Sequence, residues 1–409
     1  MATMIAGIDV HKRLLVVAVA DARGEKLKFV GRRFGTGAGD LQQLAAWLSQ
    51  QQVEAVVMES TAQYWKPVWL ALEPQFQLHL AQAFSNRAPK GRKTDFRDSQ
   101  RLVRRFIAGE LILSFVPEPA QRQMRTLTRR RVQLSRDRVR LQSQLECLLE
   151  EARVKLSSVL SDLLGASGLR ILRALAAGEK DPHALAELGD ARLQCSREQL
   201  ADAVSIPLDS THQQLLGLYL EQFALLDTHL ETLSVLAAET MRDSQQAIGR
   251  LAEIPGIQVI AAQQIVAEVG PQAASFPTAE QFSSWVGTCP GHEESAGENH
   301  NARCPKGNRY MRRVLCQAAQ AAVKTKNSRF QILFYRLVGR LGYAKAIWAV
   351  ARHLSVVVWK ILHEAVRYVE MGQATTPQAA KRRAQRMVRK LRQLGYTVQI
   401  SALSPEVTM

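Results

Sequence analysis

The sequence lacks the long apolar run of roughly 18 residues that a membrane-spanning helix requires. Its first residues, MATMIAGIDVHK, also lack the order of a basic segment followed by an apolar one that marks a signal peptide. Cysteine is scarce, with five in 409 residues, and an odd number cannot all pair. Scattered thiols of this kind are typical of a reducing compartment. These features predict a cytoplasmic protein with no membrane partner.

Acidic residues are also in short supply. There are 37 Asp and Glu against 54 Lys and Arg, which gives a formal net charge of +17. An excess of this size is typical of proteins that bind nucleic acid, although basic faces turned to solvent would also explain it. Aromatic residues make up only 6% and do not interleave with basic ones, so the pattern gives no sign of base stacking. The apolar content of 46% excludes a disordered chain.

The first part of the chain alternates between short apolar strands and amphipathic helices. MIAGID (4–9) and VEAVVMES (53–60) read as buried strands. A helix is expected within GRKTDFRDSQRLVRRF (91–106), with Thr94 as its N-cap. The order of three strands, helix, strand, helix, strand and helix predicts an α/β domain around one mixed sheet over residues 1–115.

The next part, residues 116–245, is predicted to be helical. Four leucines recur at heptad spacing: Leu127, Leu134, Leu141 and Leu148. This spacing favours a long helix in a coiled coil, although Arg131 and Arg138 interrupt the apolar seam. A second amphipathic helix is expected near 211–245, and pairing within one chain or between chains is left open. A coiled coil makes a homo-oligomer, a dimer or a tetramer, the expectation.

A mainly helical domain is expected over residues 246–370, followed by a basic tail over 371–409. The helical domain contains a polar loop, GTCPGHEESAGENHNARCPKGN (287–308). In this loop four residues are spaced C-x2-H-x7-H-x3-C, which could hold zinc: Cys289, His292, His300 and Cys304. The sequence leaves open whether zinc binds there.

Four carboxylates of the first domain stand where such groups are unfavourable without a partner. Asp9 and Glu59 end buried strands, and Asp95 and Asp98 lie one helical turn apart. Four converging carboxylates can hold two Mg²⁺ ions about 4 Å apart, and Mn²⁺ can replace Mg²⁺ at such sites. Asp95 and Asp98 also fit the start of a helix, where the dipole favours acids.

Basic side chains surround the second pair of acids, and in the metal interpretation they hold the nucleic-acid backbone: Lys93, Arg97, Arg101 and Arg104. A second basic group follows the polar loop and is expected to contact phosphate, although a solvated helix face would look the same: Lys306, Asn308, Arg309, Arg312 and Arg313.

Several segments together resemble one protein family. GIDVHK (7–12), MES (58–60) and KTDFRDSQRL (93–102) are similar to the N-terminal domain of DEDD-type insertion-sequence transposases, the IS-one-ten family. GTCPGHEESAG and KGNRYMRRVL are similar to their C-terminal domain. Relatives of this family include bridge-RNA-guided recombinases and Piv-like DNA invertases. The resemblance implies an RNase H-like, RuvC-like first domain and a helical transposase domain at the end.

The resemblance also implies residue roles. Asp9, Glu59, Asp95 and Asp98 would be the metal-binding catalytic tetrad, and Ser295 would be the nucleophile that forms a phosphoserine link to DNA. A serine hydroxyl needs an activator at neutral pH. The assisting metal centre would come from another protomer. Ala296 and Glu298 depart from the family pattern beside Gly297.

The sequence therefore predicts a DNA transposase or recombinase that acts on donor and target DNA, with a bridge RNA as its guide. It would act in a bacterial cytoplasm, on the nucleoid when bound to DNA. Three alternatives stay open. A Piv-like DNA invertase would recognise its DNA through the protein alone. A RuvC-like junction endonuclease would cut with metal and water and would not need Ser295, and a non-enzymatic coiled-coil protein would bind nucleic acid without the four acids.

Overall fold

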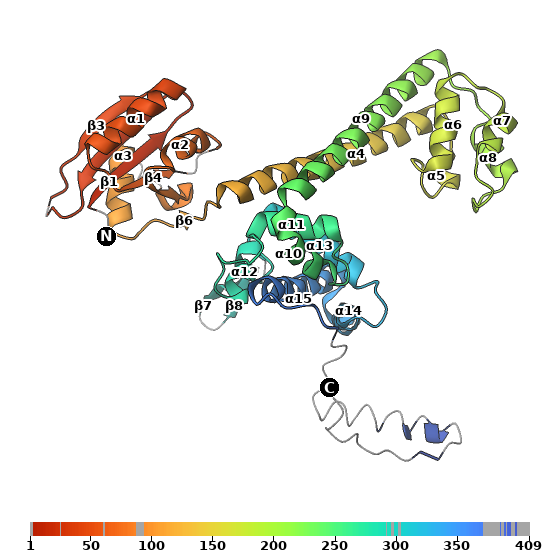
Figure 1. The fold of residues 1–409 in the computed structure, drawn as a ribbon. Coiled ribbons are helices and arrows are strands. Elements are labelled where there is room, and N and C mark those ends of the chain that lie inside the picture. The colour runs from red at the N-terminus through yellow and green to blue at the C-terminus, as the bar shows by residue number, and fades with distance from the viewer. Residues whose placement is uncertain are drawn as a thin grey trace. The chain divides into compact units, whose positions relative to one another are not determined.

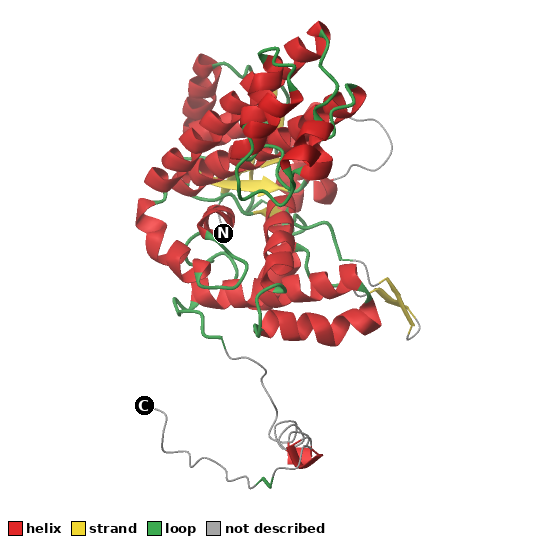
Figure 2. Cartoon of the chain, turned by 90° about the vertical axis from the view of Figure 1, so that its right-hand side faces the viewer, coloured by secondary structure: helices red, strands yellow, loops and turns green. Residues whose placement is uncertain are grey.

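The computed structural model describes residues 3–24, 26–59, 62–86, 94–291 and 304–370, together with short pieces as far as residue 398. Between 291 and 304 only the backbone of 293–295 and 298–301 is described. The chain divides into two compact units, Met1–Glu118 and Pro119–Met409. Among the described residues, strands occur in the first unit and in one short hairpin of the second, and the other regular structure is helical (Figure 2).

A mixed six-stranded sheet forms the centre of the first unit (Figure 1). Its spatial order is β3-β2-β1-β4-β5-β6. The first three strands pair antiparallel, β1 pairs parallel with β4, and β4 pairs parallel with β5. The strands are β1 (Met4–Val10), β2 (Leu15–Asp21), β3 (Val30–Phe34), β4 (Ala55–Glu59), β5 (Gln77–Ala81) and β6 (Leu113–Ser114). This order confirms the predicted α/β domain with an RNase H-like sheet.

Helices cover both faces of this sheet. On one face, α1 (Ala38–Gln50) and α2 (Trp65–Leu72) share the main apolar core with Ala6, Ile8 and Met58. On the other face, α3 (Asp95–Ile107) packs through Val103 and Leu102. Because side chains alternate along a strand, the residues next to Ile8 and Met58 face α3. Asp9 and Glu59 are therefore on the face that α3 covers.

The second unit contains two long antiparallel helices. They are α4 (Pro119–Glu151) and α9 (Ser210–Thr240), which pack along each other within the chain (Figure 1). The two arginines that interrupt the leucine pattern find partners on α9: Arg131 donates to Ser234, and Arg138 forms an ion pair with Asp227. Four short helices close the far end of the pair: α5 (Leu156–Val159), α6 (Ala166–Ala176), α7 (Pro182–Glu187) and α8 (Arg197–Ala203).

The remaining helices form a separate core around α15 (Tyr343–His363), which packs against α10, α12, α13 and α14. They are α10 (Gln245–Ala252), α11 (Val259–Val269), α12 (Ala279–Val286), α13 (Arg309–Ala322) and α14 (Arg329–Leu341). The strands β7 (Glu293–Ser295) and β8 (Glu298–Asn301) form a hairpin between α12 and α13. A helical region therefore follows the α/β domain, as predicted. Among the described residues, no helix is both long and apolar enough to span a membrane.

Candidate metal centre and serine segment

The sheet register brings the first two predicted acids together. Ile8 pairs with Met58 in the parallel ladder of β1 and β4, so Asp9 and Glu59 are the next residues on two adjacent strands. Both lie at the carboxyl ends of their strands and on the face covered by α3. Adjacent strands are about 4.8 Å apart, so the two carboxylates start from neighbouring backbone positions.

Helix α3 carries the other two acids in its first turn. Thr94 caps the helix by accepting a hydrogen bond from the backbone N–H of Arg97 at 3.4 Å. The helix lies very close to β1, because a Cβ at Gly7 would fall 2.3 Å from the carbonyl oxygen of Ser99. A Cβ at Gly31 would clash with the ring of Phe96, at 1.8 Å from its Cε2. Two glycines on the sheet thus permit α3 to bring Asp95 and Asp98 to the strand ends.

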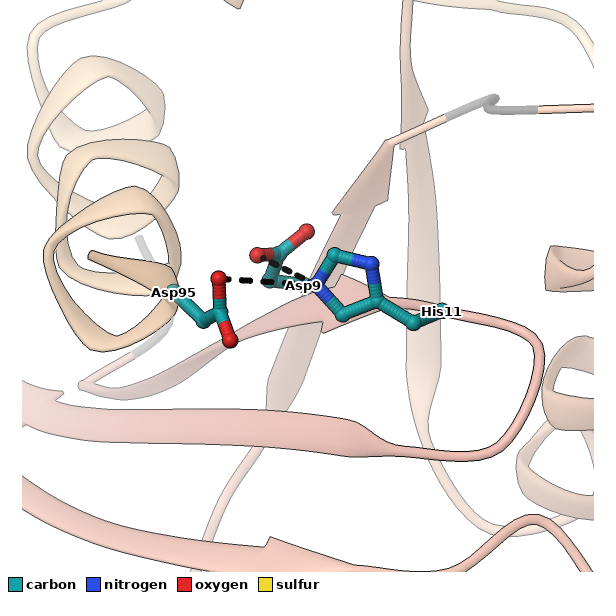
Figure 3. A group of neighbouring side chains, drawn as sticks. All are labelled: Asp9, His11 and Asp95. Carbon is teal, nitrogen blue, oxygen red and sulfur yellow. Dashed lines mark hydrogen bonds and ion pairs between the residues drawn. The ribbon is translucent and has the colours of Figure 1, made fainter. Parts of the chain in front are cut away.

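Asp9, His11 and Asp95 form a compact cluster (Figure 3). His11 Nε2 lies 3.1 Å from Asp9 Oδ2 and 3.8 Å from Asp95 Oδ1. One potential ligand atom from each residue lies within 4.8 Å of the others. The Asp9 side chain is 18% exposed, whereas His11 and Asp95 are 46% and 43% exposed, so the cluster opens to solvent on one side.

His11 was not predicted from the sequence to take part in this site. The signal was present, because His11 stands two residues after Asp9 in GIDVHK and residues at that spacing share one face of a strand. The imidazole faces the two carboxylates across the start of the β1–β2 turn (Figure 3).

The electrostatics of the cluster are unfavourable for Asp9. Burial raises the pKa of Asp9 above its ordinary value of 3.8, and the charges of Asp98 and Asp95 raise it further. His11 acts in the opposite direction. A charged carboxylate that is both desolvated and crowded by like charges is stabilised by a cation.

Glu59 and Asp98 lie in a second chain of contacts. Asn86 Nδ2 donates to Glu59 Oε2 at 2.9 Å, and Arg101 forms an ion pair with Asp98 at 2.6 Å. Arg101 Nε also donates to the carbonyl oxygen of Asn86 at 3.2 Å, which links the two acids. Asn86, in the short helix η1 (Ala83–Asn86), is buried and was not predicted from the sequence. A single asparagine that belongs to no motif or repeating pattern gives no sequence signal for this role.

The donor set fits a divalent cation. The four carboxylates offer the oxygen ligands that Mg²⁺ and Mn²⁺ bind in proteins, and the His11 imidazole lies beside two of them. Among the described residues, the group of close ligand atoms comprises Asp9, His11 and Asp95, and it does not include Glu59 or Asp98.

The basic residues predicted around α3 differ in their surroundings. Lys93 lies outside the described residues. Arg97 and Arg104 are exposed, and the Arg104 guanidinium lies 5.0 Å from the ring centre of Phe29. Arg101 is engaged with Asp98 and Asn86 and is only 20% exposed. Of the described members of this group, Arg97 and Arg104 are exposed to solvent and Arg101 is not.

The predicted serine is the last residue of β7. The backbone pairs Ser295 with Glu298 of β8, which places it at the turn of the hairpin, and its side chain lies outside the described part. Of the four residues spaced for zinc, the histidine side chains at 292 and 300 also lie outside it. Cys289 and Cys304 are half-buried thiols, and Cys304 lies 3.7 Å from the carbonyl oxygen of Thr288. Zinc binding therefore stays a prediction.

Several of the polar and basic residues predicted to contact phosphate after the hairpin form hydrogen bonds within the protein. Asn308 caps α13 by accepting from the N–H groups of Tyr310 and Met311. Arg312 donates to the carbonyl oxygens of Gly287 and Pro305, on either side of the hairpin. Arg313 reaches the Val132 carbonyl oxygen of α4 at 3.5 Å, whereas Lys306 and Arg309 are exposed. Their phosphate contacts stay predictions.

A buried acid connects this segment to the long helix pair. Glu268 of α11 is 3% exposed and accepts two hydrogen bonds from Arg129 of α4, at 2.7 and 2.8 Å. Asn308 Nδ2 donates to the same carboxylate at 3.0 Å. Arg125 lies deeper, and burial lowers its pKa to about 10 although Glu268 acts in the opposite direction. This network was not predicted from the sequence, because Glu268 lies within a largely apolar helix.

Two models of one transposase family match this chain. Residues 6–154 match the family model of the DEDD transposases of IS110 elements, and residues 249–335 match the model described as transposase, IS116/IS110/IS902 family. Together the two matches span more than half of the chain. A solved structure of RuvC from Thermus thermophilus is similar to 27% of this chain and 99% of that one, at 15% identity and a TM-score of 0.22. The comparison with curated proteins found no match.

Proposed function

The chain belongs to the IS110 family of DEDD transposases, which cut and rejoin DNA, and from this we propose how its residues divide the reaction. Asp9, Glu59, Asp95 and Asp98 hold the divalent metal, and Ser295 is the nucleophile. The observation that carries the metal part is the cluster of Asp9, His11 and Asp95 at the carboxyl end of β1, where burial and like charge disfavour an unpaired Asp9.

The metal is proposed to be Mg²⁺, as two ions, with Mn²⁺ able to replace it. Bound ions supply positive charge beside the attacking and leaving oxygens of a phosphodiester. The chain's own part is to hold the acids in place, since Gly7 on β1 and Gly31 on β3 leave room for α3 to lie against the sheet. Arg101 and Asn86 orient Asp98 and Glu59 through the contacts described above.

The serine step conserves the energy of the DNA bond. Attack by the Ser295 hydroxyl forms an oxygen–phosphorus bond, breaks one phosphodiester bond and releases a DNA end with a free hydroxyl. The phosphoserine can then pass its phosphoryl group to another DNA hydroxyl without an added energy source. The position of Ser295 at a hairpin turn, followed by the basic segment from Lys306 to Arg313, supports this role.

The second unit is proposed to assemble two or four copies of the chain. Leucines at spacings typical of one helix face remain exposed on α9, away from α4: Leu215, Leu218, Leu225 and Leu236. Such a face fits a second copy of the same helix pair. We assign residues 1–115 to the metal domain, 116–245 to assembly, 246–370 to the serine domain and 371–409 to a basic tail.

A guide RNA is proposed to select the DNA sequence. The net charge of +17 and the absence of an aromatic-basic stacking pattern support a protein that holds nucleic-acid backbones rather than reading bases. Expression beside the native flanking DNA, purification and sequencing of the bound RNA test this directly. One discrete species from the flank is expected, and bulk degraded RNA would oppose it.

Strand exchange on DNA tests the division of roles. Asp95→Asn and Ser295→Ala should each abolish recombination and leave DNA binding intact. Asp202→Asn and Ser157→Ala, which change exposed residues of the same types, should recombine normally. A denaturant-resistant protein–DNA adduct should form in the wild type and be absent from Ser295→Ala. Metal-dependent cutting by Ser295→Ala, without an adduct in any variant, would instead support a junction endonuclease.

A further inference from the structure

We propose that His11 is itself a ligand of the metal, through Nε2, and that it shifts the preference of the site from Mg²⁺ toward Mn²⁺. The inference rests on the proposed function, because it concerns the same site. It adds a nitrogen ligand to a centre otherwise assigned to carboxylates alone.

The geometry places the imidazole nitrogen where a ligand is needed. His11 Nε2 is 3.1 Å from Asp9 Oδ2, and adjacent ligands around an octahedral ion with bonds of about 2.1 Å lie about 3 Å apart. Its distance of 3.8 Å from Asp95 Oδ1 also keeps both carboxylates within reach of one ion. In Figure 3 the same ring nitrogen faces both acids.

The backbone of His11 is held in place. Its N–H donates to the carbonyl oxygen of Leu14 at 3.0 Å, which closes the turn between β1 and β2. The paired residues Val10 and Leu15 on either side are buried. The side chain therefore projects from a fixed position, and its partial exposure leaves a route for an ion to enter.

The chemistry of the ligand determines the preferred ion. Mg²⁺ binds oxygen ligands and retains several waters. Mn²⁺ also binds carboxylates, but as a first-row transition metal it accepts an imidazole nitrogen more readily than Mg²⁺ does. Replacing one oxygen ligand by an imidazole nitrogen therefore favours Mn²⁺ relative to Mg²⁺. If His11 were only a hydrogen-bond partner of Asp9, no nitrogen would bind the ion, and an amide at position 11 would replace it without changing metal preference.

Pulsed electron paramagnetic resonance on the full-length protein loaded with Mn²⁺ distinguishes these two roles. Echo modulation from a directly bound ¹⁴N nucleus is expected in the wild type, and it should change to the ¹⁵N pattern after labelling with ¹⁵N-histidine. His11→Asn should lose the modulation and bind Mn²⁺ about tenfold more weakly, with a smaller change in Mg²⁺ affinity. His183→Asn, which changes an exposed histidine of α7, should retain the wild-type signal and affinity.

The outcomes separate this inference from the proposed function. If Mn²⁺ binds in a way that Asp9→Asn abolishes, but without nitrogen modulation or with unchanged affinity in His11→Asn, the role of His11 is overturned and the carboxylate site stands. If Asp9→Asn binds Mn²⁺ as the wild type does, or the wild type binds none, the metal site itself is overturned.

Discussion

Single residues determine how closely the metal-binding helix approaches the sheet. Gly7 faces α3 at a point where the backbone oxygen of Ser99 lies in the space that a Cβ would fill. The neighbour is backbone, so it cannot rotate away as a flexible side chain would. The spacing between Asp9 on β1 and Asp95 on α3 depends on this contact.

Gly7→Ala should therefore destabilise the first unit by about 1–3 kcal/mol, the range for overpacked cores, and should also weaken metal binding. Gly39→Ala is the matched control, because nothing lies within 4 Å of a Cβ at that helical position. The control should be neutral or more stable by up to about 1 kcal/mol. Denaturant unfolding measures both, and an equal effect of the two substitutions would contradict the argument.

Asp9 is predicted to lower stability in the absence of metal. Its pKa is raised in the folded protein, chiefly by burial, so folding favours the protonated form. This contribution is fully present below the ordinary pKa of 3.8 and is lost as the pH rises through the folded-state value. At neutral pH, Asp9→Asn should therefore raise the melting temperature of the metal-free protein.

The same substitution should remove the rise in melting temperature that Mn²⁺ or Mg²⁺ produces in the wild type. The stabilisation by Asp9→Asn should also disappear near pH 3, where both side chains are neutral. Thermal unfolding with and without metal at the two pH values is the measurement. A less stable metal-free variant at neutral pH would show that Asp9 is not under electrostatic strain.

At the scale of elements, Glu268 ties α11 to α4 and to the start of α13. Arg129 is its principal partner, at 2.7 Å, whereas Arg125 lies 3.8 Å away and donates mainly to the backbone oxygens of Ala267 and Glu268. Because Asn308 joins the same carboxylate, one buried acid connects the long helix pair with the segment that follows the serine hairpin.

Glu268→Ala should destabilise the second unit by about 3–5 kcal/mol, because it removes a buried carboxylate and leaves the partly buried guanidinium groups of Arg125 and Arg129 without it. Asp227→Ala removes the partner of Arg138 on the long helix pair, but that carboxylate is 51% exposed. Asp227→Ala should therefore lower the free energy of unfolding by only about 0.2–1 kcal/mol. Urea unfolding of both variants measures this difference. Similar losses of unfolding free energy in the two variants would mean that the Glu268 network does not hold α4, α11 and α13 together.

At the scale of the whole molecule, the proposed metal residues and Ser295 belong to different compact units. If the metal site of one protomer acts together with Ser295 of another, a mixture of the Asp95→Asn and Ser295→Ala proteins should recover part of the recombination activity that each variant lacks. The mixture contains some sites with an intact metal centre from one chain and an intact serine from the other. Recombination assays on co-expressed variants measure this, and a fully inactive mixture would assign both parts to one chain.

Much of the first unit was predictable from sequence, and the physical reason is local. Strand and helix periods, the Thr94 cap and the position of Asp9 and Glu59 at strand ends all depend on neighbouring residues. The pairing of Arg131 and Arg138 with α9 was not predictable, because the sequence shows only that they interrupt a seam. Their partners lie about a hundred residues away along the chain.

The sequence by itself determined the alternation of strands and helices, the identity of the four acids and the excess of basic residues, because each depends only on residue type and spacing. Only the tertiary structure decided which groups meet. It brought His11 to Asp9 and Asp95, linked Asp98 to Glu59 through Arg101 and Asn86, and buried Glu268 between two arginines. These contacts depend on strand register and on the close approach that a glycine permits, and neither is encoded in any local pattern.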